Sequence, residues 1–72
     1  MKFNVWKTSA TPDSSIRARH IDAAADKYMA AHGDAPCDCI SDHITLLVTQ
    51  AGTVAIVEDG YSPDTEDFLT KP

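Results

Sequence analysis

Two cysteines and a histidine in one short stretch, Cys37-x-Cys39-x-x-x-His43, are the residues best suited to chemistry. Thiolate and imidazole are ligands that zinc prefers, and a structural zinc site takes four of them in a tetrahedron. His20 or His32 would have to supply the fourth ligand. Common zinc patterns separate the two cysteines by two or more residues and often repeat the pair, whereas this chain has one closer pair. We therefore predict no bound metal or other cofactor, and interpret these side chains as partly buried loop thiols and a surface histidine.

The same thiols are the candidate nucleophiles of an enzyme. A cysteine nucleophile needs a histidine base, an orienting carboxylate and an oxyanion site, all in contact. The sequence holds these residue types without a signature that assembles them, and 72 residues leave little room for a substrate cleft. The single residue between Cys37 and Cys39 also makes an intrachain disulfide strained. We predict a protein that is not an enzyme, with free thiols in a reducing compartment.

Carboxylates are the other abundant chemical group, and they are unevenly distributed. Residues 1–33 sum to +2 and residues 34–72 to −7, which gives the net charge of −5. No Lys or Arg lies between Lys27 and Lys71. The acids of the second half are Asp34, Asp38, Asp42, Glu58, Asp59, Asp64, Glu66 and Asp67. This uneven charge creates a negative electrostatic field over the second half of the chain. Such a field favours a cationic protein surface as partner and disfavours direct nucleic-acid binding.

We predict that these acids form a partner-binding surface with one aromatic anchor. Clustered carboxylates are usually a solvated face, so the anchor has to supply desolvated contact area. Trp6 or Tyr61 would supply it, because Trp and Tyr are enriched among the residues that dominate binding energy.

One small domain, residues 1–72, must position these groups, because a chain of this length forms one domain at most. Alternation of side chains predicts a strand over residues 2–8 and a second over 15–19, joined by a turn at 11–14. Apolar residues at helical spacing predict a helix over 21–32, followed by Gly33 in a left-handed conformation.

The second half adds a predicted β-hairpin after a loop at residues 34–42. β-branched residues favour strands at 44–50 and 53–57, with Gly52 at the left-handed position of a three-residue loop. That register places Ile44, Leu46, Val48, Val54 and Ile56 against the helix. It leaves Thr45, Leu47, Ala55 and Val57 on the outer face, beside Trp6.

The C-terminal residues have the pattern of a helix start. Ser62 suits the cap, Pro63 suits the first turn, and the acids that follow suit the positive end of the helix dipole. Phe68 and Leu69 would fold back beside Tyr61 and cover the outer face.

The alternative is that the outer face stays open. Trp6, Leu47 and Val57 would then form an exposed apolar patch of the kind that binds partners. In both cases the predicted fold class is α+β. It has a small antiparallel sheet with one amphipathic helix across one face, in the order β-β-α-β-β plus a short C-terminal helix.

Residues 15–29, SIRARHIDAAADKYM, resemble a strand-into-helix pattern of small bacterial and phage-encoded proteins, in which an I-x-A strand end precedes a helix with an Ala-Ala pair. Several anti-CRISPR proteins are similar: short, acidic and α+β, with a helix across a small antiparallel sheet. They share no catalytic motif. The resemblance implies a phage protein that acts as an inhibitor in the host bacterial cytoplasm. It would occupy a basic nucleic-acid-binding surface of a CRISPR effector subunit, as a nucleic-acid mimic.

The alternative function is a zinc-stabilised or homodimeric protein-interaction module of bacterial metabolism. A chain this short has a thin core, so a homodimer would be unsurprising. No stretch approaches the roughly 20 apolar residues of a membrane span, and the first residues lack the apolar core of an export signal. We expect a cytoplasmic protein with no membrane partner.

Overall fold

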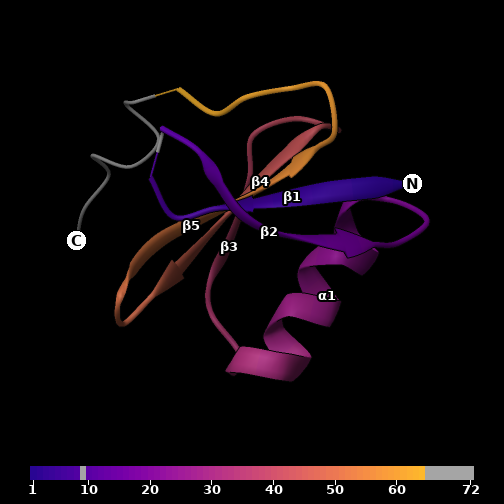
Figure 1. Cartoon of the computed structure of the whole chain (residues 1–72). Coiled ribbons are helices and arrows are strands. Elements are labelled where there is room, and N and C mark those ends of the chain that lie inside the picture. The colour runs from indigo at the N-terminus through magenta and orange to yellow at the C-terminus, as the bar shows by residue number, and fades with distance from the viewer. Residues whose placement is uncertain (9, 65–72) are drawn as a thin grey trace.

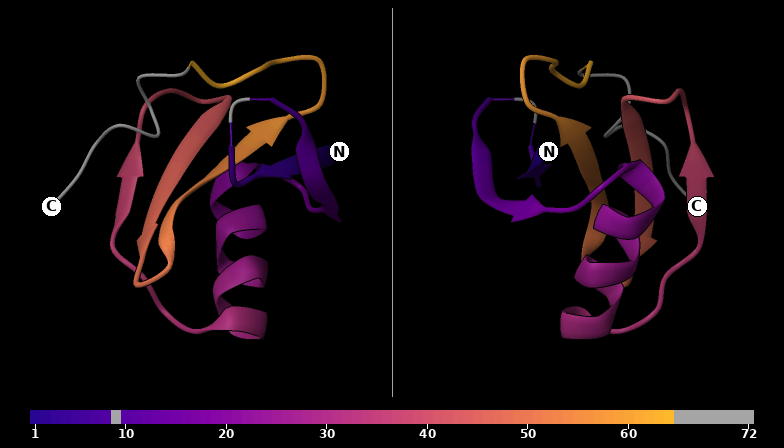
Figure 2. Two further views of the ribbon diagram at one scale, coloured as in Figure 1. Left: turned by 60° about the vertical axis from the view of Figure 1, so that its left-hand side comes forward. Right: turned by 90° about the vertical axis from the view of Figure 1, so that its right-hand side faces the viewer.

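Five strands and one helix make up the part of the chain that the structure, a computed structural model, describes: residues 1–8 and 10–64 (Figure 1). They follow in the order β1 (Lys2–Trp6), β2 (Pro12–Arg17), α1 (Ile21–His32), β3 (Cys37–Cys39), β4 (Ile44–Thr49) and β5 (Gly52–Glu58). All neighbouring strands pair antiparallel in one sheet, ordered β2-β1-β5-β4-β3. α1 lies across one face of this sheet, as Figure 2 shows. The predicted α+β class is confirmed; residues 62–64 are irregular, and the rest of the predicted C-terminal helix lies outside the described residues.

α1 forms where the apolar stripe predicts it. At its start the Nδ1 atom of His20 accepts a hydrogen bond from the Ala23 N–H at 3.3 Å. At its end Gly33 has a φ of 103°, and its N–H donates to the Met29 carbonyl at 2.7 Å. At each helix end, one of the backbone groups that lack a partner within the helix is therefore satisfied: the N–H of Ala23 and the C=O of Met29.

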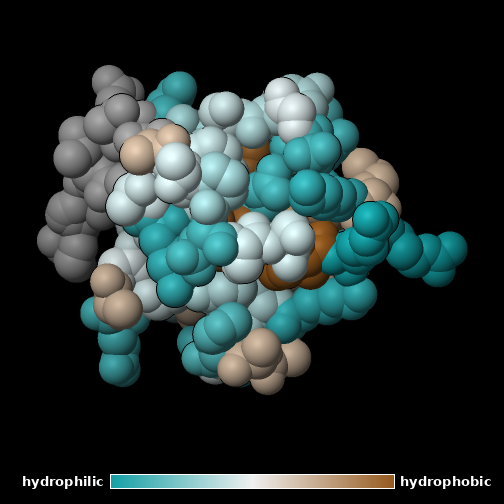
Figure 3. All heavy atoms as spheres, in the orientation of Figure 1, coloured by the Kyte–Doolittle hydropathy of each residue, from teal (hydrophilic) through white to brown (hydrophobic). Residues whose placement is uncertain are grey.

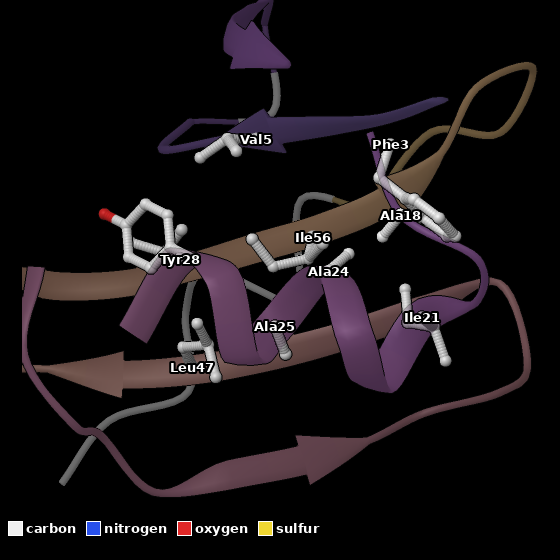
Figure 4. Packing of buried hydrophobic residues seen from close by; sticks show 10 residues of the cluster. Phe3, Val5, Ala18, Ile21, Ala24, Ala25, Tyr28, Leu47 and Ile56 are labelled. Atoms are coloured by element: carbon white, nitrogen blue, oxygen red, sulfur yellow. The ribbon is translucent and has the colours of Figure 1, made fainter. Parts of the chain in front are cut away.

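The main core lies between α1 and the sheet. Figure 4 shows the small side chains of Ala24 and Ala25 between the helix and the strands, with Leu47 and Ile56 on the sheet side. The buried residues of this cluster are Phe3, Val5, Ala18, Ile21, Ala24, Ala25, Tyr28, Leu47, Val54 and Ile56. A second, smaller cluster lies on the opposite face of the sheet and contains Trp6, Leu46, Ala55 and Val57.

β4 is shifted by one residue from the predicted register. Thr49 pairs with Gly52, so the turn consists of Gln50 and Ala51 in place of the predicted three-residue loop. Gly52 has the expected positive φ, 128°. Because side chains alternate between faces, a one-residue change in the loop moves every β4 side chain to the other face.

The predicted faces of β4 are therefore wrong, and those of β5 are right. Leu47 belongs to the core beneath α1, and Thr45 shares that face because it pairs with Ile56. Leu46, expected beneath the helix, lies beside Trp6 in the second cluster, with Ile44 packed against it.

Two strands also differ in extent from the prediction. β3 lies within residues 34–42, which were expected to form a loop, and its three residues are all exposed. β2 begins at Pro12, inside the expected turn. β3 and the first four residues of β2 are fully exposed, because both strands are sheet edges, so they lack the buried alternation that identifies a strand in a sequence.

Candidate functional site

β3 forms one edge of the sheet, and its two cysteines lie on the same face of it. Cys37 pairs with Leu47 and Cys39 with Thr45, two residues on the α1 side of the sheet. Asp38 lies between them and therefore belongs to the opposite face. Both thiols are exposed. The expected loop thiols are thus thiols of an exposed edge strand.

The surroundings of Cys37 disfavour its thiolate. Partial burial is the largest cause that raises the pKa of this thiol, and the negative charge of Asp22 is the next. Cys39, Asp26 and Asp38 raise the same pKa further. An activated cysteine nucleophile has the opposite property, a pKa lowered by nearby positive charge. The pKa shift also shows that the two carboxylates of α1 lie close enough to β3 to act on it.

Carboxylates from α1 and from the chain around β3 therefore gather at one side of the molecule. We name this set the acidic edge: Asp22, Asp26, Asp34, Asp38 and Asp42, all exposed. The two helical members were absent from the sequence-predicted surface because they belong to the half of the chain with positive charge. Their spacing of four residues places them on one side of the helix, and their effect on Cys37 shows that this side is the one nearer β3.

The cations lie toward the other edge of the sheet. β1 and β2, or the residues just after them, carry Lys2, Lys7, Arg17 and Arg19. Lys27 reaches the same edge from α1, where its Nζ atom donates to the Arg17 carbonyl at 2.6 Å. Cations therefore predominate along β1 and β2, and carboxylates predominate around β3. The division is not complete, because Asp13 lies on β2 and Asp59 bonds Asn4 of β1.

A histidine–carboxylate pair lies at the end of β5. The Nδ1 atom of His43 is 2.9 Å from the Oε1 atom of Glu58. The His43 ring stacks on Tyr61, with ring centroids 4.0 Å apart and 10° between the planes. The Tyr61 N–H donates to the Glu58 carbonyl at 3.0 Å, which fixes the turn between them. Tyr61 is held at the surface with 45% of its area exposed.

The remaining predicted site residues have different surroundings. Asp59 accepts a hydrogen bond from the Nδ2 atom of Asn4 at 3.1 Å, so this carboxylate has a partner within the chain. Asp64 is exposed. Glu66 and Asp67 lie outside the described residues.

Trp6 differs most from its predicted role. Only 8% of this residue is exposed, and its indole N–H is buried with no hydrogen-bond partner in the described part of the chain. Leu47 and Val57 are fully buried. These three residues therefore do not form an exposed patch, and Tyr61 is the aromatic residue that remains accessible as an anchor.

The three candidate metal ligands do not come together. His43 is paired with Glu58, whereas Cys37 and Cys39 face the α1 side at the sheet edge. Within residues 1–8 and 10–64, no group of three or more His, Cys, Asp or Glu side chains is arranged to hold a metal ion.

One hollow of about 890 Å³ lies where the end of α1 meets the β4–β5 turn. Its walls include Lys7, His32 and Asp34, and the His32 ring stacks on Tyr28 at 4.1 Å. Its lining includes a positively charged side chain, Lys7, and a negatively charged one, Asp34. On the face shown in Figure 3, hydrophilic side chains predominate and apolar surface appears in small areas between them.

Comparison of the chain with protein-family models, with curated proteins and with solved structures gave no match. In the described residues, no helix has the length and apolar character needed to cross a membrane.

Proposed function

We propose that this protein is a non-enzymatic interaction protein whose acidic edge binds a cationic protein surface. The observation that supports it is the division of charge across the sheet, with carboxylates around β3 and cations along β1 and β2. The resemblance to anti-CRISPR proteins suggests the partner: a basic nucleic-acid-binding surface of a CRISPR effector subunit, which the protein would occupy as an inhibitor.

Carboxylates at the edge of a sheet are suited to this task because they can replace phosphates. A surface that binds nucleic acid carries Lys and Arg side chains positioned for a row of negative charges. Complementary charge accelerates association and makes it sensitive to salt. Tyr61 would add the apolar contact area that charge alone does not provide.

The cysteines support a binding role more than a catalytic one. The raised pKa of Cys37 keeps this thiol protonated at neutral pH, and a protonated thiol is a weak nucleophile. His43 is engaged by Glu58 and Tyr61, a pairing that orders the surface next to the acidic edge.

The first experiment is an affinity pull-down of the tagged protein from lysates of bacteria that express CRISPR effector complexes. Parallel washes at about 0.05 and 0.5 M salt separate electrostatic from apolar retention. We expect an effector subunit to be retained at low salt and released at high salt. Retention of no basic nucleic-acid-binding protein would contradict the proposal.

Two single charge reversals locate the contact. Asp38→Lys changes the acidic edge, whereas Asp13→Lys makes the same change in charge on β2, where Asp13 forms an exposed ion pair with Lys7 at 3.5 Å. We expect Asp38→Lys to slow association with the partner about tenfold, and Asp13→Lys to change it less than about twofold. Equal effects of the two variants would mean that net charge, and not the acidic edge, determines binding.

The alternative function, a zinc-stabilised or homodimeric module, has its own measurement. One zinc ion per chain that is lost in Cys37→Ser, or a dimer in solution at micromolar concentration, would favour it.

A further inference from the structure

The two edges of the sheet differ in whether they can accept another strand. In an antiparallel pair, residues whose N–H and C=O groups bond the neighbouring strand alternate with residues whose groups point away from it. At a sheet edge, the second kind of residue presents its backbone groups to whatever lies outside. Which residues these are follows from the hydrogen bonds at the ends of β2 and β3.

The β2 edge is partly closed. Met1 and Ala18 exchange hydrogen bonds at 2.9 and 3.1 Å, so alternation turns the backbone groups of Ser15 and Arg17 outward. The outward carbonyl of Arg17 is already occupied by the Nζ atom of Lys27 at 2.6 Å. Pro12, at the start of the strand, has no N–H to offer. Lysine and proline are the residues with which proteins protect their edge strands.

Among residues 1–8 and 10–64, the β3 edge has outward-pointing backbone groups that no other segment bonds. The Val48 N–H donates to the Pro36 carbonyl, and the Ile40 N–H donates to the Ile44 carbonyl, each at 3.0 Å. Alternation between these two pairs turns the backbone groups of Cys37 and Cys39 away from β4. In the described part of the chain, no hydrogen bond outside the strand ladders involves the N–H or C=O of either cysteine.

The charge around β3 indicates what would pair with it. Asp38 lies between Cys37 and Cys39, the two residues whose backbone groups point outward. Asp34 precedes the strand and Asp42 follows it. Ile40, next to the strand, is 50% exposed and offers an apolar contact. A second copy of this chain added through β3 would bring acidic edge against acidic edge, which is repulsive. A cationic segment would be attracted.

We propose that β3 is a docking edge, on which an extended Lys- or Arg-bearing segment of a partner protein adds as a sixth strand. Backbone hydrogen bonds to Cys37 and Cys39 would fix the register, and the acidic edge would select the cations of that segment. The inference rests on the proposed function, because it names the form in which a cationic partner is bound.

Amide hydrogen exchange measured by NMR on the full chain tests this docking. The probe is a synthetic peptide of alternating Thr and Lys, about eight residues long to exceed a typical strand. A matched peptide carries N-methyl groups at alternate residues, which removes backbone donors and keeps the charge. In the free protein we expect fast exchange at the amides of Cys37 and Cys39.

Saturating Thr-Lys peptide should slow exchange at both amides by about tenfold or more, while Ser15 and Arg17 on β2 keep their rates. The N-methylated peptide should give no such protection. Slow exchange of Cys37 and Cys39 in the free protein would overturn the inference, because it would show that the edge is already covered.

Proline substitutions supply a second, independent test. Cys39→Pro removes an N–H that points away from β4, so the fold should tolerate it, as edge strands tolerate proline. We expect it to weaken peptide binding about tenfold, and Ser15→Pro, the equivalent change on β2, to leave binding within about twofold. Cys39→Ser controls for the thiol and should bind as the unchanged protein does.

The outcomes separate this inference from the proposed function. Salt-sensitive binding of both peptides, without protection at Cys37 and Cys39, would overturn strand addition and leave an acidic binding protein. Failure of the Thr-Lys peptide to bind, together with an empty pull-down, would contradict the proposed function itself.

Discussion

Cys37 shows how neighbouring charge sets the chemistry of a single side chain. Its thiol is exposed and next to another thiol, a combination that often marks a reactive site. Partial burial and the nearby Asp22 and Asp26 raise its pKa, and the thiol therefore stays protonated at neutral pH. The thiolate is the form that attacks an alkylating reagent. We therefore expect slow modification of Cys37 at neutral pH, and a pH–rate profile displaced to higher pH than that of a free cysteine.

Neutralising the helical carboxylates should reverse this behaviour. In a Cys39→Ser background, which leaves one reporting thiol, Asp22→Asn with Asp26→Asn is expected to lower the pKa of Cys37. Its alkylation rate with iodoacetamide at pH 7 should then rise about threefold or more. Asp13→Asn, on the far edge, is the control and should leave the rate unchanged. An unchanged rate in the double variant would show that α1 does not act on β3.

The same shift has a consequence for folding stability. The folded chain holds the Cys37 proton more tightly than the unfolded chain, because the pKa is higher in the folded state. The contribution to the free energy of unfolding is complete at pH values below the pKa of this thiol in the unfolded chain. It is lost as pH rises through the higher pKa of the thiol in the folded chain.

At the scale of elements, the β4–β5 turn determines which side chains form the core. β4, with the sequence ITLLVT, has apolar residues on both faces because both faces of the sheet are covered. Its pattern of apolar residues therefore fits either register, and the length of the β4–β5 turn determines which register forms. The sequence could identify the hairpin and Gly52, but a difference of one residue in the turn exchanged the positions of Leu46 and Leu47.

A substitution of Gly52 tests the conformation of this turn. Gly52 has a φ of 128°, and a side chain added there would meet no atom within 4 Å. The cost of Gly52→Ala is therefore a backbone cost, and we expect it to lower the free energy of unfolding by about 1–2 kcal/mol. Urea denaturation measures it, with Ala51→Ser, in the same turn, as the control. A neutral Gly52→Ala would mean that the turn adopts another conformation in solution.

The helix and the central strands were predictable because they bury residues with a regular period. The stripe that begins at Ile21 and the alternation of Phe3 and Val5 require no knowledge of the rest of the fold. β3 was missed because an exposed strand of three residues has no such period. The helical members of the acidic edge were missed because their position relative to β3 depends on strand order, which the sequence does not encode locally.

At the scale of the whole molecule, the division of charge would make the proposed binding to a cationic surface directional. A net charge of −5 alone would slow approach to any acidic surface. Cations on one side and carboxylates on the other would also orient the protein as it approaches a cationic partner, with β3 toward that partner. Orientation of this kind acts on the association rate more than on the dissociation rate.

Stopped-flow or biosensor kinetics can check this directional effect. Raising salt from about 0.05 to 0.5 M should slow association with the partner, or with the Thr-Lys peptide, by about tenfold or more. The dissociation rate should change by less than about threefold. Equal changes in both rates would indicate that the charges act only within the bound complex.

Trp6 gives the protein an internal optical label in a useful place. It is the single tryptophan of the chain, and it is buried in the cluster on the face away from α1. β5 and β4 separate its strand from β3. Its fluorescence should therefore follow unfolding of the sheet and remain unchanged when a ligand occupies the β3 edge. Folding and docking can thus be followed in one sample, by light emission for the first and by amide exchange for the second.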